Sequence, residues 1–165
     1  MTGVVDYVWE ESPVGPLLLA ADDEGLRYVL FGSGRAEVRP EPGWREDGTR
    51  LADVVRQLRA YFTGDLRRFD LPLAPQGTPF QQRVWRELLE IPYGETMSYG
   101  ELARKIGSPS ASRAVGLANG SNPISIVIPC HRVIGSSGKL TGYGGGLEKK
   151  EWLLALERGR LPLGE

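Results

Sequence analysis

The only cysteine of this 165-residue chain, Cys130, is followed directly by its only histidine, His131. A thiol and an imidazole are the nucleophile and the base that cysteine chemistry requires. The pair therefore predicts a reactive cysteine with a base beside it. A buried, inert thiol next to a surface histidine would give the same two residues, so adjacency alone leaves both interpretations open.

The composition excludes several classes of protein. One cysteine rules out an intrachain disulfide, and one cysteine with one histidine cannot build a structural zinc site, so we expect no bound metal. The sequence has no apolar run long enough to cross a bilayer and no charged-then-apolar leader. We therefore expect no membrane partner and a reducing, cytoplasmic location.

The charge is distributed unevenly along the chain. Residues 1–75 carry nine Lys/Arg and thirteen Asp/Glu, whereas residues 76–165 carry eleven and eight. No acidic residue occurs between Leu102 and Leu147, a stretch that contains Arg104, Lys105, Arg113, Arg132 and Lys139. Such a stretch could lie along a polyanion without like-charge repulsion. A modestly basic surface with no partner is the other interpretation.

The residue pattern of the first half predicts a small α/β domain over residues 1–75. Apolar and β-branched runs predict strands, helical spacing of apolar residues predicts one helix, and a segment rich in Pro, Gly and charge predicts a surface loop. The expected strands are 4–9, 16–21, 26–31 and 69–73, the helix is 51–62 and the loop is 32–48. We place the domain boundary near residue 75, in a Pro- and Gly-containing linker.

The second half, residues 76–165, predicts mainly helices. Thr78 with Gln81, and Ser98 with Glu101, are capping boxes that each predict the start of a helix. A third helix is expected from Ser108-Pro109 to about Asn119, and its short connection to the preceding helix predicts a helix-turn-helix. Its Ala, Ser and Gly residues suit close contact with DNA or tight helix packing equally well.

The segment that leads to the reactive pair is short and apolar. Residues 124–128 predict a buried strand, and Pro129 restricts the backbone after it. We therefore expect Cys130 and His131 at the end of a fixed strand, with their side chains pointing apart. A glycine-rich loop and an amphipathic helix at 147–158 follow, the loop lacking the residue order of a phosphate-binding loop.

Residues from about 77 to 157 resemble the catalytic domain of the O6-alkylguanine-DNA alkyltransferases, the methylated-DNA–protein-cysteine methyltransferases. The resemblance rests on ordered motifs at the family's spacing: Phe80-Gln81, Val84-Trp85, Pro92-Tyr93-Gly94-Glu95-Thr96, Ser98-Tyr99, Ser112-Arg113-Ala114-Val115-Gly116, Asn122-Pro123, Ile128-Pro129-Cys130-His131-Arg132-Val133, and Gly142-Tyr143 to Glu157. In the first half it rests only on Ser12-Pro13-Val14-Gly15-Pro16-Leu17.

The resemblance implies a fold and an activity. It implies a ribonuclease-H-like domain with a small antiparallel sheet and a helix, then a mostly α, winged-helix-like domain with the helix-turn-helix. The implied function is direct-reversal DNA repair, in which Cys130 takes the alkyl group from O6-alkylguanine in double-stranded DNA and is consumed. O4-alkylthymine is a second candidate substrate. The resemblance implies no cofactor and a monomer.

It also implies roles for individual residues. Cys130 would be the nucleophile, and His131 would accept its proton through a water. Spacing leaves Glu148, Glu151 and Glu157 as possible partners of the histidine, and the family pattern selects Glu157.

The implied substrate-binding residues lie mainly on the helix-turn-helix. Arg113 would fill the space of the flipped base, and Tyr99 would assist flipping and donate to the base. Ser112, Ala114 and Gly116 would contact the minor groove. Asn122 would tie the turn after the third helix to the active-site segment, and Val133, Tyr143 and Gly144 would line the base pocket. Minor-groove contact predicts weak, salt-sensitive and sequence-tolerant binding.

Two other functions remain possible at this point. A non-catalytic module could bind alkylated DNA and recruit other repair factors, although such relatives replace the nucleophile that this chain keeps. A cysteine hydrolase could use Cys130 and His131 alone, but it would leave the surrounding motifs without a role. Asn119-Gly120-Ser121 lacks the basic residue that some family members place there.

Overall fold

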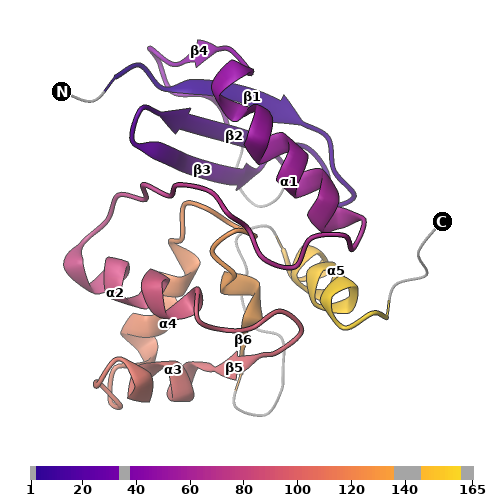
Figure 1. The fold of residues 1–165 in the computed structure, drawn as a ribbon. Helices are drawn as coiled ribbons and strands as arrows, with labels where there is room; N and C mark the ends of the chain where they lie inside the picture. The colour runs from indigo at the N-terminus through magenta and orange to yellow at the C-terminus, as the bar shows by residue number, and fades with distance from the viewer. Residues whose placement is uncertain (1–2, 34–37, 136–145, 161–165) are drawn as a thin grey trace.

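A computed structural model describes residues 3–33, 38–135 and 146–160 of the chain. The N-terminal half folds as a sheet with one helix on it, and the C-terminal half is mainly helical (Figure 1). The strands are β1 (Asp6–Glu10), β2 (Leu17–Asp22), β3 (Gly25–Phe31), β4 (Arg45–Glu46), β5 (Met97–Ser98) and β6 (Val133–Ile134). The helices are η1 (Thr49–Leu51), α1 (Ala52–Phe62), α2 (Pro79–Leu88), α3 (Tyr99–Lys105), α4 (Ser112–Gly120), η2 (Cys130–Arg132) and α5 (Leu147–Glu157).

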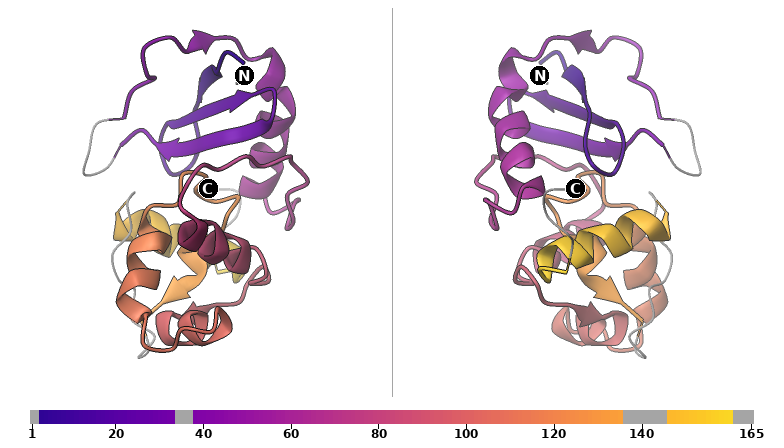
Figure 2. Two further views of the ribbon diagram at one scale, coloured as in Figure 1. Left: turned by 90° about the vertical axis from the view of Figure 1, so that its left-hand side faces the viewer. Right: turned by 90° about the vertical axis from the view of Figure 1, so that its right-hand side faces the viewer.

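The four-stranded sheet has the order β3-β2-β1-β4. The pairs β1–β2 and β2–β3 are antiparallel, and β4 adds in parallel to β1 from within the expected surface loop. Every residue of β2, which lies between β1 and β3, is buried. Helix α1 lies across the sheet (Figures 1 and 2) and buries Val54, Leu58 and Tyr61.

The outer edge of β3 is covered by two distant parts of the chain. Leu73 of the interdomain segment forms a bridge with Leu26, where the Leu26 N–H donates to Pro72 at 2.8 Å. Ile124 bridges Val29, whose N–H donates to Pro123 at 3.0 Å. The edge of the sheet is thereby attached to the segment that leads to Cys130.

The helical half begins as its capping residues predict. The Thr78 hydroxyl accepts from the Gln81 N–H at 3.1 Å, and Ser98 accepts from Glu101 at the same distance. In both boxes the side chain of the third helical residue also accepts from the backbone N–H of the capping residue. Two otherwise free N–H groups are thereby satisfied at each helix start. Helices α3 and α4 then form the two helices of the expected helix-turn-helix.

Three expected elements differ in the structure. The third helix begins at Ser112 and not at Ser108, because Pro109 lies in a turn in which the Ala111 N–H donates to Ser108. Residues 69–73 form a single bridge and not a strand. Residues 124–128 are all buried, as expected, but beyond the bridge at Ile124 they form turns and not a strand.

Buried apolar side chains from both halves form one continuous core. It joins Leu17, Leu19 and Leu58 of the first half to Leu88, Val115 and Leu153 of the second. Within the described residues, no helix combines the length and the apolar character that crossing a membrane would require.

Candidate active site

The backbone before Cys130 contains a strained residue. Ile126 has a φ of 73°, a conformation that a β-branched residue rarely adopts, and such a residue costs about 1–3 kcal/mol. The Val127 N–H donates to Ser125 at 2.8 Å across it, which closes a γ-turn, and Ile128 donates to Ile124 at 3.0 Å. The surrounding contacts must hold this turn in place.

Two asparagines from the region of α4 provide such contacts. The Asn122 side-chain amide donates to the Ile128 carbonyl at 2.8 Å, and its oxygen accepts from the Ile124 N–H at 2.9 Å. The Asn119 amide donates to the carbonyl of Cys130 at 3.3 Å. The end of the second helix of the helix-turn-helix is thus bonded to the segment that carries the thiol.

Cys130 begins the short helix η2 and does not end a strand. Its N–H donates to the Ile128 carbonyl at 2.8 Å around Pro129, whose φ of −81° and ψ of 64° define an inverse γ-turn. The expectation of a reactive pair at the end of a strand is therefore wrong, because the turns around Ile126 and Pro129 replace it. Cys130 is 4% exposed and His131 is fully buried.

Glu157 is the partner of His131. The His131 Nε2–H donates to Glu157 Oε2 at 2.6 Å, whereas Glu148 and Glu151 are exposed on the same helix. Arg132 binds both carboxylate oxygens, at 2.7 and 3.0 Å. Four donor residues therefore surround one carboxylate, because the Tyr61 hydroxyl and the Gly94 N–H also donate to it, at 2.6 and 3.4 Å.

These contacts decide the charges of the pair. Burial by itself would raise the pKa of Glu157, but the hydrogen bonds and charges of His131 and Arg132 hold that pKa well below its usual value. Burial lowers the pKa of His131 against the opposing effect of Glu157. Near neutral pH the site therefore contains a carboxylate and a neutral imidazole that can accept a proton.

The second ring nitrogen of His131 is the one available for that proton. Among the described residues, Nδ1 is one of two buried side-chain nitrogen or oxygen atoms without a hydrogen-bond partner. Because Nε2–H is committed to Glu157, Nδ1 is the acceptor of the neutral ring. This tautomer is the one that a relay from a thiol to the imidazole requires.

Lys150 of α5 is a second charged group near the thiol. Its side chain is fully buried, and its Nζ donates to the Val133 carbonyl at 2.6 Å. The N–H of Val133 in turn donates to the carbonyl of Cys130. Burial lowers the pKa of Lys150, and the charge of Cys130 opposes that shift, so the two groups interact.

The residues expected to contact DNA lie on the helix-turn-helix. Ser112, Arg113 and Ala114 are exposed in the first turn of α4. Tyr99 is the first residue of α3, and a methyl group on Gly116 would come within 3.8 Å of its ring. The two helices therefore approach each other where Gly116 faces Tyr99, beside the exposed Arg113 turn.

Two residues expected in the base pocket fall outside the part of the chain that the structure describes, namely Tyr143 and Gly144. Val133 is buried and pairs with Met97 in the short parallel sheet β5–β6. This pairing places the strand after Cys130 beside the residue that precedes Ser98 and Tyr99.

Sequence reasoning missed four residues of this site: Tyr61, Asn119, Arg132 and Lys150. Arg132 lies within a quoted motif and Asn119 lies between two of them, so their positions in the sequence could have indicated that they belong to the site. Lys150 had a weaker signal, because a lysine on the apolar face of an amphipathic helix is unusual. Tyr61 had none, because 96 residues separate it from Glu157.

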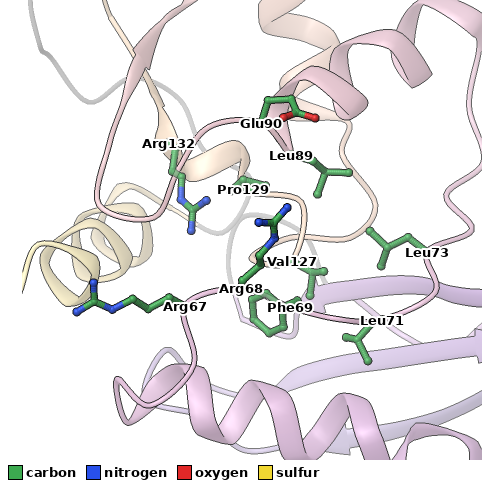
Figure 3. Close-up of a pocket in the computed structure, with 10 residues that line it drawn as sticks. All are labelled: Arg67, Arg68, Phe69, Leu71, Leu73, Leu89, Glu90, Val127, Pro129 and Arg132. Atoms are coloured by element: carbon green, nitrogen blue, oxygen red, sulfur yellow. The ribbon is translucent and has the colours of Figure 1, made fainter.

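A cavity of about 260 Å³ lies between the two halves of the molecule and is lined in part by the active-site segment (Figure 3). Its walls come from the interdomain segment, the end of α2 and the turns before and after Cys130. The lining residues are Arg67, Arg68, Phe69, Leu71, Leu73, Leu89, Glu90, Val127, Pro129 and Arg132. Cys130 is not among them, so this cavity is distinct from a pocket that would present a base to the thiol.

Known proteins share both halves of this chain. Residues 6–75 match the family described as 6-O-methylguanine DNA methyltransferase, ribonuclease-like domain, and residues 79–159 match its DNA binding domain. The methylated-DNA–protein-cysteine methyltransferase of Methanosarcina acetivorans is 58% identical over 151 residues, which cover 92% of this chain and 97% of that protein. The protein of that name from Mycobacterium tuberculosis is 54% identical over 162 residues, 96% of each chain.

Solved structures agree with the sequence matches. The crystal structure of the Mycobacterium tuberculosis O6-methylguanine methyltransferase has a TM-score of 0.86 and 54% identity, and it covers 96% of both chains. A second structure, of Mycobacterium tuberculosis OGT in complex with DNA, has a TM-score of 0.89 and 53% identity with the same coverage. The expected fold class, a small sheet domain followed by a helical domain with a helix-turn-helix, is confirmed.

A ribonuclease-like domain, a DNA-binding helical domain and a buried cysteine beside a histidine–glutamate pair define a class of DNA repair alkyltransferases. Identity above half over nearly the whole chain narrows the class to one family. The chain belongs to the methylated-DNA–protein-cysteine methyltransferases, as its motifs predict.

Proposed function

We propose that this protein repairs O6-alkylguanine in double-stranded DNA by moving the alkyl group to Sγ of Cys130. The observation that carries the proposal is the buried His131–Glu157 pair directly after the thiol, with Nε2 bonded at 2.6 Å and Nδ1 left to accept a proton. A free thiol has a pKa of about 8.5, so it needs such a base to react near neutral pH.

The reaction is a displacement at the alkyl carbon. The thiol proton passes through a bridging water to His131 Nδ1, and the sulfur lone pair forms the S–C bond. The C–O bond breaks with its electrons remaining on the guanine, which takes up a proton from solvent, while His131 releases the thiol proton to solvent. Tyr99 donates a hydrogen bond that offsets the charge on the departing base. The product is a thioether, and since nothing in this reaction reverses it, each molecule acts once.

The base must leave the helix before it can reach a thiol that is 4% exposed. We assign Arg113, exposed on α4, to the space that the base vacates, with Ser112, Ala114 and Gly116 against the minor groove. Asn122 keeps the active-site turn in place. We propose that the protein binds DNA as a monomer and that it works in a reducing compartment, where the thiol stays reduced.

The direct test is the intact mass of the protein after incubation with duplex DNA containing O6-methylguanine. The wild-type protein should gain the mass of one CH₂, located on Cys130 by peptide mapping, and Cys130→Ala should gain none. An unmodified wild-type protein would contradict the proposal. Persistent binding to the lesion without a mass change would instead indicate a lesion-binding module, and turnover of an ester or amide would indicate a hydrolase.

A further inference from the structure

Tyr61 belongs to the N-terminal domain, yet its hydroxyl bonds to the catalytic carboxylate. It lies in the last turn of α1, is fully buried, and donates to Glu157 Oε2 at 2.6 Å. Its ring is fixed by Phe62, Phe69 and Tyr93, with ring centroids 5.4, 5.3 and 6.3 Å away. The position of the hydroxyl is therefore set by ring packing from its own domain, through Phe62 and Phe69, and from the C-terminal domain, through Tyr93.

The oxygen that Tyr61 binds is the same one that binds the histidine. Glu157 Oε2 accepts from Tyr61 and from His131 Nε2, each at 2.6 Å, and from Arg132 at 3.0 Å. Rotation of the carboxylate would break the bond to Tyr61 and the bond to His131 together. Within the described residues, Tyr61 is the one donor to this oxygen that comes from outside the C-terminal domain.

The hydroxyl stays protonated in this position. Burial raises the pKa of Tyr61 well above its ordinary value, and the charge of Glu157 raises it further. Tyr61 therefore acts as a permanent hydrogen-bond donor and takes no part in proton transfer. Its effect on the thiol can pass only through Glu157 and His131.

We infer that Tyr61 is a positioning residue for alkyl transfer, through which the N-terminal domain completes the active site. The hydroxyl holds Glu157 in the rotamer that orients the His131 ring, so that Nδ1 faces the proton path from Cys130. This inference rests on the proposed function. It assigns the N-terminal domain a part in the chemistry besides its part in the core.

The substitution Tyr61→Phe removes one oxygen and keeps the ring. We expect the first-order rate of alkyl transfer at saturating lesion DNA to fall about tenfold, the effect of losing one hydrogen bond to a charged group, with DNA affinity unchanged. The matched control is Leu58→Ala, a fully buried position one turn earlier on α1 that has no polar contact. It weakens the same helix but leaves the carboxylate network intact.

A second measurement needs no DNA. His131 is the only histidine, so its imidazole signals can be followed by NMR in an untagged protein without assignment. The charged groups that act on it are Glu157 and Lys150 from α5 and Arg132 from its own turn, and Tyr61 from α1 bonds to the oxygen of Glu157 that the imidazole also binds. With one donor fewer, Glu157 Oε2 becomes a better acceptor for His131, so Tyr61→Phe should raise the pKa of the imidazole. Leu58→Ala should not change it.

The outcomes are separable. If the wild-type protein gains no mass from lesion DNA, the proposed function fails, whatever the variants do. If the wild-type protein is active, and Tyr61→Phe has the wild-type rate and imidazole pKa, Tyr61 is only structural and the inference is overturned. The inference is also overturned if Leu58→Ala slows alkyl transfer as much as Tyr61→Phe does and neither variant changes the pKa of the imidazole. Should Tyr61→Phe not fold, 3-fluorotyrosine at position 61 keeps the hydroxyl, donates more strongly, and should lower the imidazole pKa.

Discussion

His131, the side chain next to the nucleophile, is oriented by a hydrogen bond to Glu157, 26 positions further along the chain. His131 follows Cys130 directly, but its ring is oriented by Glu157 and not by the peptide bond that joins the two. The bond at Nε2 leaves Nδ1 as the basic nitrogen, and burial keeps the ring neutral. Adjacency in sequence thus brings the imidazole near the thiol, and in the proposed reaction the carboxylate orients it to accept the thiol proton.

The same burial predicts how stability depends on pH. In the unfolded chain an imidazole takes up a proton below about pH 6.5. In the folded protein the pKa of His131 is lowered, so its imidazole takes up a proton only at a lower pH. The unfolded state therefore binds more protons, and the folded protein loses stability as the pH falls below about 6.5. Glu157, whose folded pKa is also lowered, adds to the loss below about pH 4.5, where an unfolded glutamate becomes protonated. We expect the melting temperature to fall by about 3 °C per pH unit between pH 6.5 and 5.

Thermal unfolding of His131→Gln provides the control for this prediction. Without an imidazole, the slope of melting temperature against pH between 6.5 and 5 should be clearly smaller than in the wild-type protein. Equal slopes in the two proteins would show that other groups cause the acid sensitivity.

Lys150 predicts an effect on the thiol itself. A buried ammonium near Cys130 favours the thiolate, and Lys150 also holds the Val133 carbonyl of the same turn. We expect Lys150→Met to raise the pKa of Cys130. The measurement is the pH dependence of iodoacetamide alkylation without DNA. Lys149→Met is the matched control, because Lys149 lies over the Phe31 ring; a similar shift in that variant would contradict the prediction.

At the scale of elements, the sequence was sufficient to predict helix starts, which depend on local bonds. It was not sufficient to predict segments whose conformation depends on pairing with distant residues. The capping residues Thr78 and Ser98 placed two helix starts correctly, because a cap bonds to residues three positions away. Residues 124–128 were misassigned because an apolar run shows burial but not whether the backbone pairs or turns. The bridge to Val29 and the bonds from Asn122 help to determine that conformation. Tyr61 was missed for the same reason, since its partner lies in the other domain.

Helix α4 carries an apolar side chain that packing does not explain. Leu117 is 73% exposed and lies one turn after Arg113, on a helix whose other exposed residues, apart from that arginine, are small. Minor-groove proteins insert apolar side chains of this kind. We expect Leu117→Ala to weaken binding to lesion duplex about fivefold, the loss of about 1 kcal/mol of apolar contact.

Leu89→Ala is the control, because Leu89 is 45% exposed at the end of α2 and lines the cavity between the domains. It should bind DNA as the wild-type protein does. The salt dependence should stay unchanged in Leu117→Ala and become shallower in Arg113→Ala, since only the arginine carries charge. Equal affinity of the Leu117→Ala and wild-type proteins would show that this side chain lies outside the interface.

At the scale of the whole molecule, the two domains are joined through the active site. The edge of β3 pairs with both Leu73 and Ile124, Tyr61 reaches Glu157, and one apolar core extends through both halves. The strained turn at Ile126 follows directly after the Ile124 bridge. The N-terminal sheet therefore helps to keep the backbone before Cys130 in a conformation that it would not adopt alone.

Such coupling predicts that the two domains unfold together. In hydrogen exchange, the most protected amides of β2 and α2 should report the same free energy of opening in the wild-type protein. Leu58→Ala, which removes core volume on the N-terminal side, should lower both values by the same amount, about 2–5 kcal/mol. Independent domains would give a different result, because the substitution would then lower protection in β2 and leave α2 unchanged. Equal loss in α2 would mean that damage to the N-terminal domain is transmitted to the helices that hold the reactive cysteine.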